Sequence, residues 1–242
     1  MKNKPEHIIW NNVEHPIGCV VIIPSVDENI EKYTDLANFL NRGGYIAYGI
    51  GNTSVDDTYT DILNTELDAI KKRYALPLFL VGCGYGTIIM HNIQNRSAVA
   101  RACVSVPNMR AIGFSKLVAM RILVWMGKNI FGPDTYASSI GKRLHIDNIT
   151  YQKCGTVIRQ LMRHANQIQS KTPILVINGG DISYTDGQLA RMLYNIYSHH
   201  DMNNLTLMIY PDAGNAPLFD PMRDTVHTDI MDFLGQENHQ RI

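Results

Sequence analysis

The segment 78–90 holds the residues whose types and spacing come closest to a catalytic motif. Its sequence is LFLVGCGYGTIIM. An apolar run is followed by glycines at positions 82, 84 and 86 and then by a second apolar run. A strand, a tight glycine turn and a helix in this order form the frame of a nucleophile elbow, G-x-S-x-G, which exposes a serine at the turn. Gly84 stands where that frame has its serine, so the attacking hydroxyl is missing.

Four stretches of the chain together resemble the monoglyceride lipase and lysophospholipase-like branch of the α/β-hydrolases. Members of that family have PLFLLGHSMGG, HGxGEHSxRY, G-Y-x-V-x-x-x-D and TLxIYxGAxH. In the same order, the matching segments here are PLFLVGCGYGT at 77–87, PSVDENIEKY at 24–33, GYIAYGIG at 44–51 and TLMIYPDAGN at 206–215. The order and spacing of the four segments carry the resemblance, which covers most of the chain.

The resemblance implies a catalytic triad whose positions have degenerated. The family nucleophile falls on Gly84, and the general base falls on Asn215, whose amide cannot accept and return a proton near neutral pH. The acid falls near Asp181, although the spacing is one residue short and an ungapped register would place Ile182 there. Removing a single triad member typically costs a factor of ~10⁴ to 10⁶ in rate, so we expect no route through an acyl-enzyme.

The resemblance also places a former oxyanion hole at Ser25, Val26 and Tyr85. Tyr85 can still offer its backbone N–H, but Pro24-Ser25 replaces the His-Gly turn of the family. We therefore expect a catalytically inactive homologue that binds a lipid or acyl ligand, or a protein partner. Two alternatives stay open, namely an active carboxylic-ester hydrolase with relocated catalytic residues, and a structural or decoy protein without a ligand.

An active hydrolase would need another nucleophile, and the two alternative candidates near the elbow are Cys83 and Ser25. Cys83 stands at a position whose side chain points away from the direction of the nucleophile, which favours a packed thiol. Ser25 is most simply interpreted as a turn residue. His227 lies on an expected helix and would need an unusual loop path to reach the place of the base. The four separated cysteines and the run His199-His200-Asp201 lack the spacing of a metal site, and no metal or cofactor is expected.

The elements that must position these residues alternate along the chain. Short β-branched runs predict strands, and apolar residues at three- to four-residue spacing predict helices. The expected strands are Gly18–Ile23, Tyr45–Ile50, Pro77–Val81, Val99–Val106, Ile174–Asn178 and Leu205–Tyr210, and the expected helices are Asp35–Asn41, Thr60–Tyr74, Ile88–Asn95, 114–131, 155–169, Gly187–Ser198 and Arg223–Leu234. This alternation predicts an α/β fold with a mainly parallel sheet and helices on both faces. With the resemblance, it predicts one α/β-hydrolase domain over 1–242 with a reduced helical cap at about 108–171.

Composition and charge exclude several classes of protein. The chain has 242 residues, of which 45% are hydrophobic and 18% charged, so it is neither disordered nor fibrous. Its 22 basic and 22 acidic residues balance, which removes the positive charge typical of nucleic-acid binders. No run approaches the ~18 apolar residues of a membrane span, and no signal peptide is evident, so we expect a cytoplasmic protein. Peripheral membrane contact could come only through the cap, where 117–126 is apolar.

Overall fold

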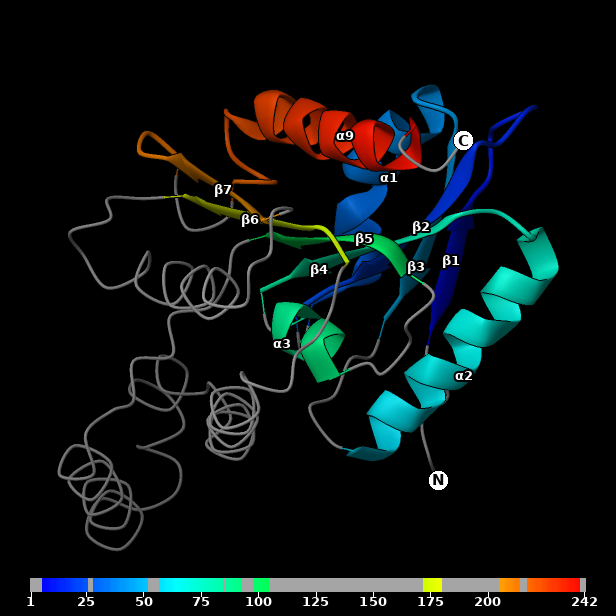
Figure 1. Cartoon of the computed structure of the whole chain (residues 1–242). Coiled ribbons are helices and arrows are strands. Elements are labelled where there is room, and N and C mark those ends of the chain that lie inside the picture. Colours follow the sequence, from blue (N-terminus) through cyan, green and yellow to red (C-terminus); the bar gives the residue numbers. More distant parts are fainter. Residues whose placement is uncertain are drawn as a thin grey trace, which may run out of the picture.

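The computed structural model describes residues 6–25, 28–51, 57–84, 86–92, 98–104, 172–179, 205–213 and 217–239. Within these ranges, seven strands form one sheet in the order β1-β3-β2-β4-β5-β6-β7 (Figure 1). The strands are β1 (His7–Trp10), β2 (Gly18–Ile23), β3 (Tyr45–Ile50), β4 (Leu78–Cys83), β5 (Ala98–Val104), β6 (Ile174–Gly179) and β7 (Leu205–Tyr210). The helices are the 3₁₀ helix η1 (Ile30–Tyr33), α1 (Thr34–Arg42), α2 (Asp57–Tyr74), α3 (Gly86–Asn92) and α9 (Arg223–His239).

The strands from β2 to β7 pair in parallel, and β1 pairs antiparallel with β3 at one edge. In parallel strands all carboxyl ends meet at one edge of the sheet, which is where such folds build their sites. The expected α/β fold with a mainly parallel sheet is confirmed.

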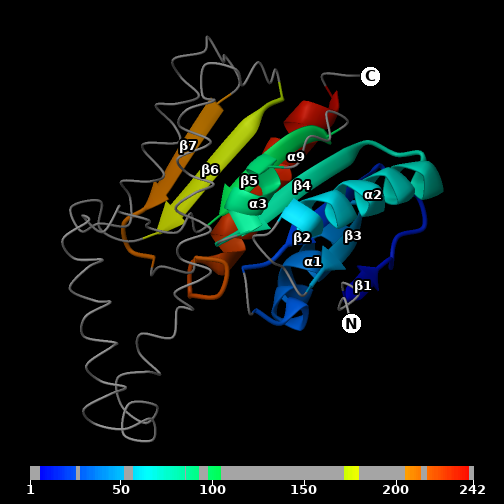
Figure 2. The same ribbon diagram turned by 90° about the horizontal axis from the view of Figure 1, so that it is seen from below.

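Each face of the sheet has its own hydrophobic core, because successive side chains of a strand point to opposite faces. Along β2, Val21 and Ile23 pack on the side of α2 and α3, whereas Val20 and Ile22 pack on the side of α1 and α9. Figure 2 shows α2 and α3 on the near side of the sheet and α9 behind it. Strands covered on both faces read as unbroken apolar runs, which is why β2 to β6 are buried along their whole length.

The structure differs from the sequence expectations at several elements. β1 was not expected, since its four residues carry no strong pattern; its place is set by pairing with β3 and by Asn41, whose Nδ2 donates to the carbonyl oxygen of Trp10 at 2.9 Å. β4 continues through Cys83, and α3 begins at Gly86 instead of Ile88. The expected cap at 108–171 and the expected helix at 187–198 lie outside the described residues. Among the helices that the structure describes, none combines the length and the hydropathy needed to cross a bilayer.

Candidate functional site

The turn after β4 has the backbone geometry of an elbow. Gly84 directly follows the strand with a φ of +53°, a left-handed conformation that costs a residue with a Cβ atom roughly 1–2 kcal/mol. The N–H of Gly84 donates to the carbonyl oxygen of Val104 on β5 at 2.9 Å. Its own carbonyl oxygen accepts from the Thr87 hydroxyl at 2.7 Å and from the Thr87 N–H at 3.1 Å. The turn is therefore fastened to β5 on one side and to α3 on the other.

Gly86 lets α3 pack directly on the backbone at the end of β2. A Cβ on Gly86 would lie 2.1 Å from the carbonyl oxygen of Ile23 and 2.6 Å from that of Pro24. Both are backbone atoms, so no rotation of a side chain could relieve the overlap. Close packing of α3 on β2 therefore requires a glycine at position 86.

Ser25 lies over the elbow. Ile23, the last residue of β2, stands beside Gly82 of β4 in the register of the sheet, so the chain after β2 passes the turn after β4. A Cβ on Gly84 would lie 2.7 Å from the Oγ of Ser25 and 2.9 Å from its Cβ. The side chain of Ser25 thus occupies the space toward which a side chain at position 84 would point.

A carboxylate holds the turn that carries Ser25. The N–H of Ser25 donates to Oε2 of Glu28 at 3.2 Å, and the N–H of Glu28 donates to the carbonyl oxygen of Ser25 at the same distance. The hydroxyl of Tyr33 donates to Oε2 of Glu28 at 2.6 Å. The ring of Tyr33 is buried and meets Phe219 edge to face, with 5.3 Å between centroids. Glu28 thereby ties the Ser25 turn to the end of η1.

Neither Glu28 nor Tyr33 was given a role from the sequence. The sequence did contain a signal for both, because they stand where the family motif HGxGEHSxRY has its Glu and its Tyr. That match was the available signal, and the contact between the two side chains gives it a structural meaning.

Cys83 belongs to the core on the α1 and α9 face, where it is 2% exposed. Burial raises the pKa of its thiol, and the nearby charge of Glu28 raises it further. Burial likewise raises the pKa of the Tyr33 hydroxyl. At neutral pH both groups are therefore protonated, and since the thiolate is the attacking form of cysteine, Cys83 is a poor nucleophile.

His227 packs between two helices. Its ring on α9 lies 5.5 Å from that of Phe39 on α1, and the residue is 2% exposed. Among the described residues, its Nε2 has no hydrogen-bond partner. Burial lowers the pKa of the ring, so the neutral form is favoured. These contacts give His227 a packing role at the interface of α1 and α9.

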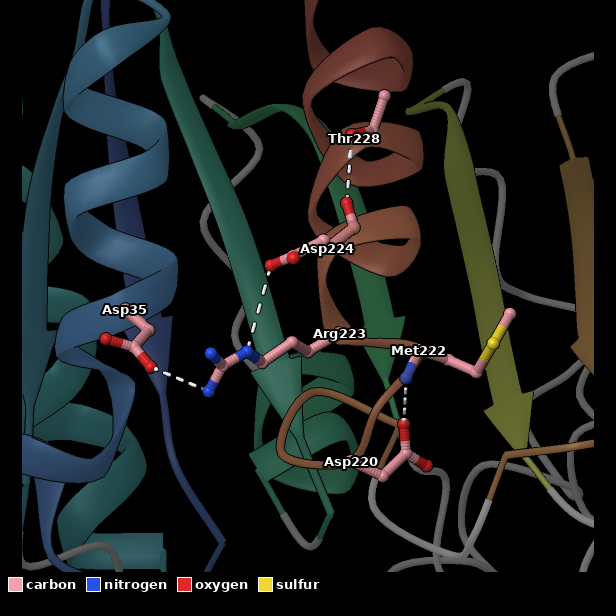
Figure 3. A network of polar contacts seen from close by, with 6 residues as sticks. All are labelled: Asp35, Asp220, Met222, Arg223, Asp224 and Thr228. Atoms are coloured by element: carbon pink, nitrogen blue, oxygen red, sulfur yellow. Dashed lines mark hydrogen bonds and ion pairs between the residues drawn. The ribbon is translucent and has the colours of Figure 1, made fainter.

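A network of largely exposed polar contacts lies at the start of α9, next to this interface (Figure 3). The guanidinium of Arg223 lies 3.2 Å from Oδ2 of Asp35 on α1 and 3.7 Å from Oδ1 of Asp224. Oδ1 of Asp220 accepts from the N–H of Met222 at 2.9 Å. The carbonyl oxygen of Asp220 also accepts from the N–H of Arg223 at 3.1 Å, so the turn after Phe219 leads directly into α9.

The remaining predicted site positions, Asp181, Asn215, Val26 and Tyr85, lie outside the described residues. The strands that precede Asp181 and Asn215 are β6 and β7, and both end at the same edge of the sheet as β4.

Over the part of the chain that the structure describes, no group of three or more His, Cys, Asp or Glu side chains could hold a metal ion.

Solved structures share this architecture. A highly thermostable carboxyl esterase from Bacillus coagulans, solved in complex with glycerol, matches 98% of this chain and 95% of its own with a TM-score of 0.73 and 15% identity. The chain has the α/β-hydrolase fold. A monoacylglycerol lipase from Paleococcus ferrophilus shares it at 19% identity and a TM-score of 0.66, with 97% of this chain and 100% of the lipase covered.

A third structure with the α/β-hydrolase fold is a soluble variant of monoglyceride lipase from Saccharomyces cerevisiae, solved with a substrate analog. It is 15% identical, with a TM-score of 0.65 over 96% of this chain and 91% of the lipase. No model of a protein family matches the chain, and no curated protein matches it significantly. At these identities the likeness is one of fold.

Proposed function

We propose that this chain is a non-catalytic protein of the α/β-hydrolase fold that holds an acyl ligand instead of cleaving it. The proposal rests on the elbow, where Gly84 has no side chain and Ser25 lies over it. Acyl transfer by a serine hydrolase needs a nucleophile and a base that takes its proton. Position 84 supplies no nucleophile, and the resemblance puts an asparagine, Asn215, at the place of the base.

The other side chains at the elbow are poorly suited to attack an ester. Cys83 is buried and protonated at neutral pH. Ser25 would need a base to remove its proton, and the Glu28 carboxylate that holds its turn already accepts hydrogen bonds from a backbone N–H and from the Tyr33 hydroxyl. Because this carboxylate oxygen already accepts two hydrogen bonds that hold the turn, we assign Glu28 a structural role rather than that of a base.

An acyl group is the favoured ligand because of the proteins that share the fold. They include a carboxyl esterase and two monoacylglycerol lipases, one of them solved with a substrate analog. In parallel sheets, ligands bind at the carboxyl edge, where the elbow of this chain lies. We infer that the same edge receives an acyl chain here and that loss of the nucleophile converts an enzyme into a binder.

Two measurements on the full chain test this function. The first is hydrolysis of p-nitrophenyl butyrate together with labelling by a fluorophosphonate probe, with an active esterase of the same fold as positive control. We expect no turnover above the rate without protein and no labelling. The second is the thermal unfolding midpoint with added 1-oleoylglycerol. A ligand at ~100 times its Kd stabilises a fold by about 2.7 kcal/mol, so we expect a rise of several degrees, with free glycerol as the control.

Turnover, or labelling that disappears when one Ser or Cys is replaced, would overturn the non-catalytic assignment and favour an active carboxylic-ester hydrolase. If the protein is inactive and its thermal unfolding midpoint does not change with 1-oleoylglycerol, the proposal that it binds an acyl ligand is overturned. That result would leave the binding of a protein partner, or a structural role without a ligand, as the function to pursue.

A further inference from the structure

We propose that Ser25 closes the elbow: its side chain fills the space that any side chain at position 84 would need, so the two residues depend on each other. Besides the missing nucleophile at position 84, a second residue, in the segment after another strand, maintains the closed form of the turn.

The steric overlap between Ser25 and a Cβ on Gly84 has one part that a side-chain rotation can relieve and one part that it cannot. A Cβ on Gly84 would lie 2.7 Å from the Oγ of Ser25, 2.9 Å from its Cβ and 3.8 Å from its Cα. Rotation about χ1 would move the Oγ, but the Cβ is fixed by the backbone. The distance to the Cα is an ordinary contact. Replacing Ser25 with glycine would therefore remove the whole overlap, whereas replacing it with alanine would leave the Cβ in place.

Neither backbone is free to retreat. The Ser25 turn is closed by the two hydrogen bonds with Glu28, and Glu28 is held in turn by the Tyr33 hydroxyl. The elbow is bonded to Val104 and Thr87, and the packing of Gly86 on the carbonyl oxygen of Ile23 joins the two segments. Because packed interiors resist such shifts, adding one carbon atom at position 84 has to strain the structure.

The side chain of Ser25 also restricts where a ligand can lie at the elbow. An ester carbonyl has to lie next to the side chain of the elbow residue before it can be attacked. The Oγ and Cβ of Ser25 lie 2.7 and 2.9 Å from the place that the first atom of this side chain would take, and both Ser25 and Gly84 are half-buried. Ser25 is thus a positioning residue that keeps a carbonyl group from the usual place of reaction, even if a serine were restored at position 84.

A double-mutant cycle in urea unfolding tests the pair. The proteins are the wild type, G84A, S25G and S25G/G84A. The left-handed backbone at position 84 penalises alanine in both backgrounds, so this effect cancels in the cycle. We expect G84A to lower the folding equilibrium constant about tenfold less in the S25G background than in the wild type, a coupling of ~1.4 kcal/mol. S25A/G84A should show a smaller coupling, because the Cβ of residue 25 remains.

Gly44 provides the matched control. It also has a positive φ, +87°, and a Cβ there would lie 3.3 Å from Cγ1 of Ile17. Gly44 precedes β3 at the amino edge of the sheet, whereas Ser25 follows β2 at the carboxyl edge. G44A should therefore destabilise the wild type and the S25G variant by the same amount.

Additive effects of S25G and G84A would overturn the proposal. If G84A does not fold, a folded S25G/G84A protein supports it, and failure of both while G44A folds overturns it. The cycle measures stability alone, so it is independent of the proposed function. Fluorophosphonate labelling of the wild type that is lost in S25A would sink the non-catalytic assignment and leave the cycle unaffected.

Discussion

The hydroxyl of Tyr33 donates a 2.6 Å hydrogen bond to the Glu28 carboxylate, and the same oxygen atom accepts the N–H of Ser25 at 3.2 Å. One carboxylate oxygen thus joins the end of η1 to the turn that lies over the elbow. Hydrogen bonds to a charged acceptor are stronger than neutral ones, typically ~1.5–3 kcal/mol net. This small polar cluster holds the turn that carries Ser25 over Gly84.

Replacing Tyr33 with phenylalanine is expected to destabilise the protein by about 1–2 kcal/mol, because Glu28 loses its shortest hydrogen bond. Urea unfolding measures the change. Tyr45→Phe is the matched control: it lies in the same core, and its buried hydroxyl has no partner among the described residues, so its removal should be neutral or stabilising. Equal losses in the two variants would show that the Glu28 contact contributes nothing.

Two helical glycines should respond in opposite directions to alanine. Gly86→Ala is expected to cost more than about 2 kcal/mol or to prevent folding, because its Cβ would overlap the backbone of Ile23 and Pro24. Gly235→Ala, within α9, meets nothing within 4 Å and should stabilise by about 0.5–1 kcal/mol through helix propensity. Thermal unfolding of the two variants compares them directly. A tolerated Gly86→Ala would contradict the close packing of α3 on the end of β2.

His227 is expected to make stability depend on pH. Burial lowers its folded-state pKa below the ordinary value, so between the unfolded and folded pKa values the unfolded chain binds more protons. The contribution is complete above pH 6.5 and declines as the pH falls through that value toward the folded pKa. Asp224 and Asp35 oppose the lowering of the pKa, while Arg223 and Arg42 add to it.

The measurement is the free energy of unfolding in urea from about pH 7.5 down to about pH 5, on both sides of the ordinary pKa of 6.5. H227Q should lose less stability on acidification than the wild type, because its side chain does not titrate. If the free energy of unfolding falls equally with pH in H227Q and the wild type, the buried ring does not cause the loss of stability in acid.

The ion pair between Arg223 and Asp35 is expected to contribute little. Both side chains are at least half exposed, and exposed pairs are worth ~0–1 kcal/mol with strong screening by salt. D35N should therefore change the unfolding free energy by less than about 1 kcal/mol at roughly 0.15 M salt. The difference should shrink further at about 1 M salt. A larger, salt-independent loss would mean that Asp35 acts through contacts other than Arg223.

Much of the fold could be predicted because its signals are local. Buried parallel strands need unbroken apolar runs, and Gly18–Ile23 and Tyr45–Ile50 were predicted with the bounds that the structure gives. The strand, glycine turn and helix around Gly84 follow from one short segment. β1 could not be predicted, since its four residues become a strand only through pairing with β3.

The sequence by itself determined that a strand, a glycine turn and a helix surround Gly84, and that position 84 has no nucleophile. Only the tertiary structure decided that Gly84 and Ser25 meet. Their contact depends on the register of β2 against β4, which no pattern within either segment contains. The same holds for Tyr33, Glu28 and Phe219, whose contacts join separate segments. Local patterns specify which elements form, whereas contacts between distant residues are set by how the elements pack.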